Sequence, residues 1–227
     1  MKRIICSRKI TREIEANIIN LGLTPVKLRG IDSFGEFHPL NYHPDMFCYN
    51  LRGNNWIFYE SAYINNKDVL ENLGLDIFIE PDPVFGEYPH YICLNCAKVG
   101  ASIICAEKYA NAKILESAEN IIGVNQGYAR CSVCIAGESI ITADKNIYKN
   151  FPGNKLLIEP GHIDLFSYNY GFIGGCSGYF DNKLLFTGDI KAHPDYLKIK
   201  KFCENINIDI ISLSREKLRD YGGLFIL

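Results

Sequence analysis

The chain has 227 residues, of which 24 are Lys or Arg and 26 are Asp or Glu, so its formal net charge is −2. This balance excludes the basic surface that nucleic acids and anionic membranes require. No stretch reaches the roughly eighteen apolar residues of a membrane-spanning helix, and the amino terminus has no apolar segment of signal-peptide length. Nine cysteines without a secretion signal are typical of a reducing compartment, so we expect a cytoplasmic protein.

The first thirty residues predict a strand, a helix and a second strand. Residues 3–6 and 25–28 are short apolar segments, and residues 11–21 between them have helical spacing of apolar positions. The last residues, 223–227, are again apolar and predict one more strand. The two ends of the chain therefore supply one strand–helix–strand unit with a further strand to pair with it.

Between the ends, one pattern recurs four times: two strands joined by a turn, a polar or helical stretch, and a compact apolar strand. In 91–108 and 129–145 the first strand contains a C-x-x-C motif and a glycine-bearing turn joins it to the second, and 43–60 and 172–189 share the outline of two strands joined by a turn. Helices are expected at 66–74 and 196–202. The third strands of the four units are expected at 76–81, 120–124, 155–160 and 208–213.

Four internal units and one built from both termini predict an α/β fold, a five-bladed ββαβ propeller closed by pairing of the terminal strands. Closure removes the exposed sheet edges that promote aggregation. The alternative is a three-layer α/β sandwich that merely alternates its elements. We expect a single domain, 1–227, with units at 1–30 plus 214–227, 40–82, 88–126, 127–160 and 161–213.

Three short motifs carry a resemblance to a known superfamily. They are Glu-Pro-Gly-His-Ile-Asp at 159–164, Tyr-Gly-Phe-Ile-Gly-Gly at 170–175 and Asp-Tyr-Gly-Gly at 220–223. Together with five ββαβ units they resemble the pentein superfamily of guanidine-modifying enzymes. This superfamily includes deiminases, dimethylarginine hydrolases, amidinotransferases and a non-enzymatic ribosome-associated factor. The chain looks like a bacterial branch distinct from these named enzymes.

The resemblance implies a polar central channel with His162 as general acid/base and Asp164 as the group that grips a guanidinium. It also implies a nucleophilic cysteine shortly after a Gly-Gly near the carboxyl end. Here Gly222-Gly223 is followed by Leu-Phe-Ile-Leu, without a cysteine. The nucleophile of a catalytic pentein is therefore missing from its expected place.

Two other cysteines are candidates for that role. Cys131 follows Arg130, whose charge is expected to lower the pKa of the thiol, and Cys176 lies in a Gly-Gly-Cys-Ser-Gly run. In the enzyme hypothesis one of them attacks an amidine-type carbon while His162 moves the proton, and no cofactor is needed. In the alternative hypothesis the protein only binds a small molecule or another macromolecule.

A second His-x-Asp step occurs at His43 and Asp45. Residues i and i+2 of a strand share a face, and a carboxylate beside a histidine raises its basicity and can bind a planar cation. We expect His43, Asp45 and Arg130 to contact a small polar or cationic ligand bearing a guanidinium or amine. The alternative is that such residues merely cap turns.

The two C-x-x-C motifs offer a third hypothesis, a structural zinc site. Cysteine pairs at this spacing can bind tetrahedral zinc. Each pair lies in a predicted strand, however, where residues i and i+3 face opposite sides, which favours buried structural thiols and no metal. The four residues concerned are Cys93, Cys96, Cys131 and Cys134.

Two further motifs indicate structure rather than chemistry. His193-Pro194-Asp195 is expected to cap the helix that follows it. The glycine-rich run at 171–178 lacks the lysine of a phosphate loop and predicts a tight turn or a close backbone approach.

Overall fold

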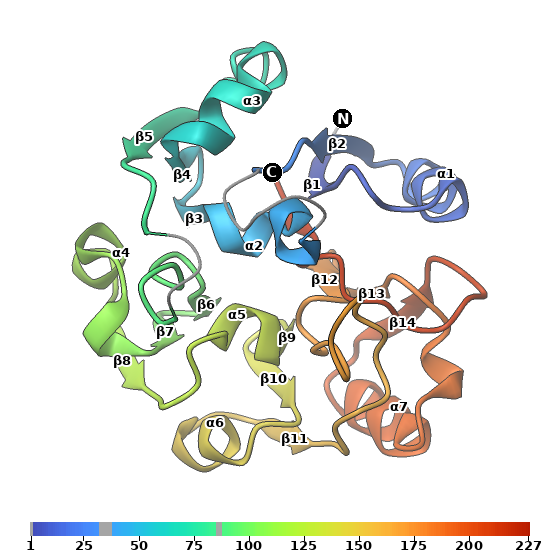
Figure 1. Ribbon diagram of the computed structural model, residues 1–227. Coiled ribbons are helices and arrows are strands. Elements are labelled where there is room, and N and C mark those ends of the chain that lie inside the picture. Colours follow the sequence, from blue (N-terminus) through green and yellow to red (C-terminus); the bar gives the residue numbers. More distant parts are fainter. Residues whose placement is uncertain (1, 32–37, 85–87) are drawn as a thin grey trace.

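Five small sheets surround a central axis in the computed structural model, which describes residues 2–31, 38–84 and 88–227 (Figure 1). The longer helices lie at the periphery, outside the sheets. These outer helices are α1 (Arg12–Asn20), α3 (Glu60–Leu70), α4 (Ala112–Glu116), α6 (Lys145–Asn150) and α7 (Tyr196–Asn205).

Each of the four internal sheets has an inner strand antiparallel to the middle strand and an outer strand parallel to it. The helix of each unit lies between its middle and outer strands in the sequence, as a ββαβ order requires. In chain order the strands are β3 (Cys48–Arg52), β4 (Asn55–Tyr59), β5 (Asp76–Glu80), β6 (Ala97–Val99), β7 (Ser102–Cys105), β8 (Asn120–Gly123), β9 (Val133–Ala136), β10 (Ser139–Thr142), β11 (Lys155–Leu157), β12 (Ser177–Phe180), β13 (Lys183–Phe186) and β14 (Asp209–Ser212).

The fifth sheet joins the two ends of the chain. Strand β15 (Phe225–Ile226) is antiparallel to β1 (Arg3–Ser7), and β1 is parallel to β2 (Thr24–Leu28). The expected five-bladed propeller, closed by its terminal strands, is confirmed. The three-layer sandwich is wrong, because the strands form five separate sheets of three rather than one continuous layer.

The core lies between adjacent sheets. Successive residues of a middle strand point to opposite faces, so each middle strand packs against both neighbouring sheets. Ile103 belongs to one apolar cluster and Ile104 to the next, and Ile140 and Ile141 divide in the same way. This two-sided burial explains why the middle strands are continuous apolar runs with no polar alternation.

Helix α3 begins six residues earlier than the sequence predicts, at Glu60 instead of 66. The polar residue that marked the expected start, Asn66, lies inside the helix and is buried. Its amide accepts a hydrogen bond from the Arg29 backbone N–H (2.6 Å) and donates one to the Arg29 carbonyl (3.0 Å). The asparagine thus ties the helix to the neighbouring unit and does not cap it.

Asp195 stands at the N-cap position of α7, but its side chain makes no capping hydrogen bond. It accepts from the backbone N–H of Glu159 (2.7 Å) and pairs with Lys198 (2.6 Å). The expectation that the Asp195 carboxylate caps the helix is therefore wrong.

Within the described ranges no helix is both long enough and apolar enough to cross a bilayer.

Truncating a middle-strand residue should be far more destabilising than truncating an outer-strand residue of the same type. Ile104→Ala removes a side chain that is fully buried between sheets, so it should lower the free energy of unfolding by about 2–5 kcal/mol. Ile121→Ala on β8 is the matched control, because that side chain is 41% exposed, and its effect should stay within about 0.5 kcal/mol. Urea unfolding measures the free energy of unfolding of both variants. Equal losses of stability in the two would contradict a core in which the middle strands are buried on both faces.

Candidate functional site

Five short segments lead into the inner strands and meet at one end of the axis. Two of them are the short helices α2 (Pro44–Phe47) and α5 (Ala129–Ser132), which lie near the centre in Figure 1. The other three are turns at 94–96, 174–176 and 220–223, which precede β6, β12 and β15. We call these the five entry segments.

Hydrogen bonds join the entry segments into a closed ring. Asn95 donates from its side chain to the Asp45 carbonyl (3.0 Å), and its Oδ1 accepts from the backbone N–H of Arg130 (2.9 Å). The carbonyl of Cys131 accepts from the N–H of Gly175 (3.1 Å). The carbonyl of Gly175 accepts from the backbone N–H of Tyr221 (3.0 Å). The carbonyl of Gly222 accepts from the backbone N–H of Asp45 (3.2 Å).

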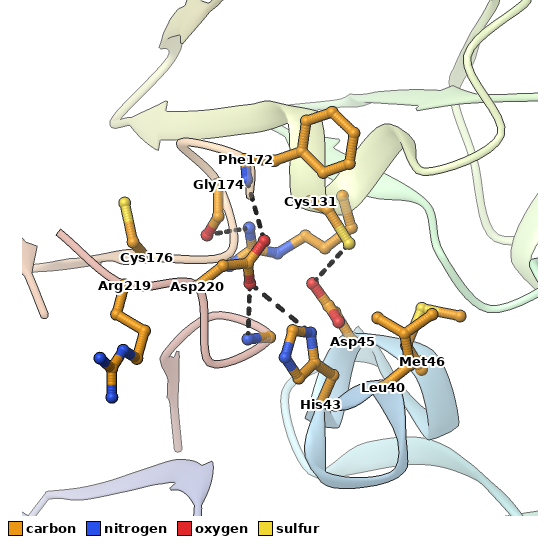
Figure 2. A network of polar contacts seen from close by, with 12 residues as sticks. Leu40, His43, Asp45, Met46, Cys131, Phe172, Gly174, Cys176, Arg219 and Asp220 are labelled. Atoms are coloured by element: carbon orange, nitrogen blue, oxygen red, sulfur yellow. Dashed lines mark hydrogen bonds and ion pairs between the residues drawn. The ribbon is translucent and has the colours of Figure 1, made fainter. Parts of the chain in front are cut away.

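One polar group in this ring unites Cys131, Asp45 and Asn95. The Cys131 thiol donates to Asp45 Oδ2 at 3.0 Å (Figure 2). Asn95 Nδ2 lies 3.2 Å from the same sulfur. All three side chains are buried. The second carboxylate oxygen of Asp45, Oδ1, is buried and has no hydrogen-bond partner among the described residues.

A second polar group pairs His43 with Asp220. Their Nδ1 and Oδ1 atoms are 3.5 Å apart, an ion-pair distance without hydrogen-bond geometry (Figure 2). Asp220 is held by two backbone donors, Phe172 to Oδ2 (2.9 Å) and Gly222 to Oδ1 (3.0 Å). This carboxylate is therefore fixed in place, while His43 Nδ1 has no hydrogen bond from the described residues.

Glycines make room for Asp220 and His43. A Cβ on Gly175 would lie 1.9 Å from Asp220 Oδ1, and one on Gly222, whose φ is +78°, would lie 2.4 Å from the His43 Cα. Only glycine fits at such distances and tolerates that φ. The close backbone approach predicted for the glycine-rich run at 171–178 is confirmed at Gly175.

Burial and charge keep the thiol of Cys131 protonated. Burial raises its pKa well above the ordinary value, and the negative charges of Asp45 and Asp220 raise it further. Burial also raises the pKa of Asp45, with Asp220 adding to the shift and His43 opposing it. Two acids and a thiol at such close range, with one histidine nearby, form a site that is short of positive charge.

A cavity of about 240 Å³ opens directly above these groups. Its polar floor contains His43, Cys131 and Asp220, and its walls include Tyr128 and Phe172, whose rings stack at 6.2 Å. Aromatic faces above paired carboxylates suit a flat cation.

A second cavity, of about 510 Å³, adjoins the first and shares His43 and Asp220 with it. Lys9 and Arg219 also line this second cavity, so positive side chains stand beside the acidic floor. A ligand with a cation at one end and an acid at the other finds partners for both.

The residues assigned by resemblance lie elsewhere. His162 and Asp164 are exposed and line neither cavity over the ring. The His162 ring packs edge-on against His193 at 5.3 Å, and Asp164 contributes through its backbone, whose carbonyl accepts from the Asp220 N–H (2.9 Å). The structure does not support the expectation that these two side chains lie in the central pocket, because both are exposed and the backbone of Asp164 pairs with the segment 218–220.

Cys176 is also outside the pocket. It is fully buried in an apolar cluster, its thiol lies 3.3 Å from the Ile173 carbonyl, and Figure 2 shows it apart from the Cys131–Asp45 pair. Of the two cysteines considered as nucleophiles, only Cys131 lines a cavity.

The zinc hypothesis is not supported. No cluster of three or more potential metal ligands occurs within 2–31, 38–84 and 88–227, which include all nine cysteines. Cys93 bonds to the Tyr59 hydroxyl (3.0 Å), whereas Cys134 belongs to an apolar cluster. The C-x-x-C motifs also do not lie wholly in strands, since Cys93 and Cys96 precede β6 and Cys131 is in α5.

Arg130 is adjacent to Cys131 but its guanidinium is turned away from the thiol. Its Nη1 donates to the Gly174 carbonyl (3.1 Å), and its charge is not among the causes that set the pKa of Cys131. The expectation that Arg130 activates this cysteine is wrong, because side chains of adjacent residues diverge at the end of α5.

Sequence reasoning missed Asn95 and Asp220 as site residues. Asp220 stands next to the Gly222-Gly223 pair that carries the resemblance, and this proximity was the available signal. Asn95 lies between Cys93 and Cys96, and nothing in its surroundings marks it. Its role becomes visible only when the ring of entry segments is assembled.

One comparison with known proteins identifies a family, and another finds no match. The family model described as "Family of unknown function (DUF6873)" matches residues 5–225. No curated protein matches the chain.

Solved structures share the fold at low sequence identity. The amidinotransferase SxtG of the saxitoxin pathway from Microseira wollei is 12% identical, with 94% of this chain and 88% of that chain covered and a TM-score of 0.56. A DDAH from Pseudomonas aeruginosa, solved with citrulline, is also 12% identical, covers 94% and 92%, and scores 0.50. A C. jejuni agmatine deiminase is 10% identical, covers 98% and 80%, and scores 0.50. These likenesses establish the pentein fold.

The buried carboxylate of Asp45 should make stability fall as pH rises. The pKa of Asp45 in the folded protein is higher than its ordinary value of 3.8. Between the ordinary pKa and the raised pKa, the folded state therefore binds more protons than the unfolded state. The free energy of unfolding of the wild type, relative to Asp45→Asn, should therefore decline from about pH 4 upward. Urea unfolding at several pH values tests this, with exposed Asp164→Asn as control, and parallel curves for wild type and Asp45→Asn would contradict it.

Proposed function

Because the chain belongs to the DUF6873 family and has the pentein fold, we propose that it binds a small molecule bearing a guanidinium group in the cavity above His43, Asp45 and Asp220. The observation that carries the proposal is the Asp220 carboxylate on the floor of this cavity, together with a second buried carboxylate, Asp45, whose Oδ1 has no partner among the described residues. Among the described residues, neither carboxylate forms an ion pair with a lysine or arginine. A buried negative charge is stable only when it is paired or neutralised, and a cationic ligand supplies the missing partner.

The shape of the cavity favours a planar cation over a compact ammonium. Tyr128 and Phe172 stack with an interplanar angle of 27°, so the wall offers flat aromatic faces. A guanidinium can lie against such a face while its N–H groups point at carboxylates. The similarity in fold to a DDAH solved with citrulline, which has a flat terminal group, supports this class of ligand.

The contact between Cys131 and Asp45 favours a second candidate function, cleavage of a carbon–nitrogen bond in that ligand. A bound guanidinium would offset the charges of Asp45 and Asp220, which raise the pKa of the thiol. The Cys131 proton would pass to Asp45 Oδ2, 3.0 Å away, as the sulfur attacks the amidine carbon. The C–N bond then breaks, the amine leaves with a proton, and water hydrolyses the S–C bond and restores the thiol.

The histidine suited to this reaction is His43 and not His162. His43 lines the cavity floor, whereas His162 is exposed outside it. His43 can exchange a proton with the leaving amine or the attacking water. The chemistry uses no cofactor.

Binding can be measured by thermal unfolding with arginine and agmatine, guanidine compounds with and without a carboxylate. A ligand at one hundred times its Kd should stabilise the protein by about 2.7 kcal/mol, which raises Tm by about 5–10 °C. Asp45→Asn and Asp220→Asn should weaken binding about 10–100-fold, since each removes a charge-assisted hydrogen bond. Asp164→Asn, which lies outside the cavity, is the matched control. No shift with any guanidino compound, or equal losses in all three variants, would refute the site.

Turnover is tested separately, by release of ammonia or urea from a panel of guanidino compounds. Release should be abolished in Cys131→Ala and retained in Cys176→Ala, since only the first thiol lines the cavity. Ligand binding without release by the wild type would leave the binding function standing and refute the reaction. Release that persists in Cys131→Ala would assign the chemistry to another residue.

A further inference from the structure

The central channel has a second opening, distinct from the cavity above the ring. Residues from all five inner strands line it, it has a volume of about 260 Å³, and it shares no lining residue with the first cavity. Most of its lining residues belong to the inner strands, and Cys96 and Arg130 reach it from two of the entry segments. The ring therefore closes the channel between two separate openings.

Arg130 brings a positive charge to the inner end of this second opening. Its side chain is only 6% exposed, and the guanidinium lies 4.8 Å from the centre of the Phe225 ring. Nη1 donates to the carbonyls of Gly174 (3.1 Å) and Val133 (3.4 Å). Among the described residues no carboxylate pairs with Arg130. Its charge acts on the buried Asp45 carboxylate without contact. A buried guanidinium that no anion contacts is expensive in free energy, which favours binding of one.

Two more buried donors line the same opening without partners. Tyr49 and Trp56 line the opening, but Tyr49 Oη and Trp56 Nε1 are buried and without a hydrogen-bond partner within the described part of the chain, so a ligand reaches them only when these side chains shift. Indole Nε1–H can only donate. Burial raises the pKa of Tyr49 well above its ordinary value, so the phenol keeps its proton and can donate as well.

The remaining charge at the opening is also positive. The Lys98 ammonium lines it and bonds to the Leu51 carbonyl, and no Asp or Glu stands among its lining residues. A water molecule could accept only two of these hydrogen bonds and would neutralise no charge. An oxyanion accepts from several donors at once and offsets Arg130.

We propose that this second opening binds a small oxyanion, a carboxylate or phosphate group, held by Arg130, Tyr49 and Trp56 with Lys98 at its edge. The proposal does not rest on the guanidinium function, because the two openings share no residue and differ in charge. An experiment can therefore refute anion binding at this opening without refuting cation binding above the ring, and the reverse.

The test uses the single tryptophan of the chain. Its indole N–H gives one signal in a nitrogen–proton correlation spectrum, and a new hydrogen bond to an anion moves that proton downfield. The protein is titrated with inorganic phosphate and, separately, with acetate, against potassium chloride at matched ionic strength. The expected result is a saturable downfield shift with phosphate or acetate and none with chloride, and the more effective anion identifies the group bound.

Three variants locate the site. Tyr49→Phe removes a hydroxyl that has no protein partner, so the protein should stay folded while anion affinity falls about tenfold. Tyr179→Phe is the matched control, because Tyr179 also lines the opening but its hydroxyl already donates to Asn182 (2.8 Å). The affinity of this variant for the anion should equal that of the wild type. Arg130→Gln should abolish binding. An indole shift that follows ionic strength alone, or wild-type affinity in Tyr49→Phe, would overturn the proposal.

Discussion

The ring of hydrogen bonds at the axis is the constraint on which the rest of this structure depends. The sheets pack against each other through apolar side chains, which are non-directional and would tolerate small rotations. The ring is directional, since Asn95 and the backbone groups of Asp45, Cys131, Gly175 and Gly222 must meet in one arrangement. It sets the relative rotation of the five units and holds Asp45 against Cys131.

The same ring separates two regions of opposite charge. On one side, His43, Cys131 and Asp220 line a cavity with aromatic walls, and on the other Arg130 and Lys98 line a second opening. Arg130 and Cys131 are neighbours in sequence, yet their side chains belong to different openings. Among the described residues neither the Asp45 nor the Asp220 carboxylate forms an ion pair with Arg130, although the charge of Arg130 opposes the rise in the pKa of Asp45.

This separation explains the state of the thiol. A cysteine beside an arginine is commonly activated, but here the arginine is directed away and two carboxylates surround the sulfur. The resting thiol is therefore neutral and unreactive. Reactivity, in the function proposed above, depends on a cation that enters the cavity, so the charge of the ligand controls the nucleophile.

The sequence by itself determined the architecture, because hydrophobic period and turn chemistry are local. The apolar runs and glycine turns predicted five units, and the apolar residues at both ends predicted closure. The spacing of His43 and Asp45 singled them out as candidates, but they lie at the start of α2 and not on one face of a strand as expected. Only the tertiary structure decided which residues share the pocket. His162 and Asp164 carry the more familiar motif but are exposed and line neither cavity, while Asn95 and Asp220 stand in turns that are held by contacts distant in sequence. Motif spacing reports neighbours along the chain, and a site on a fivefold axis is made of residues that no local pattern connects.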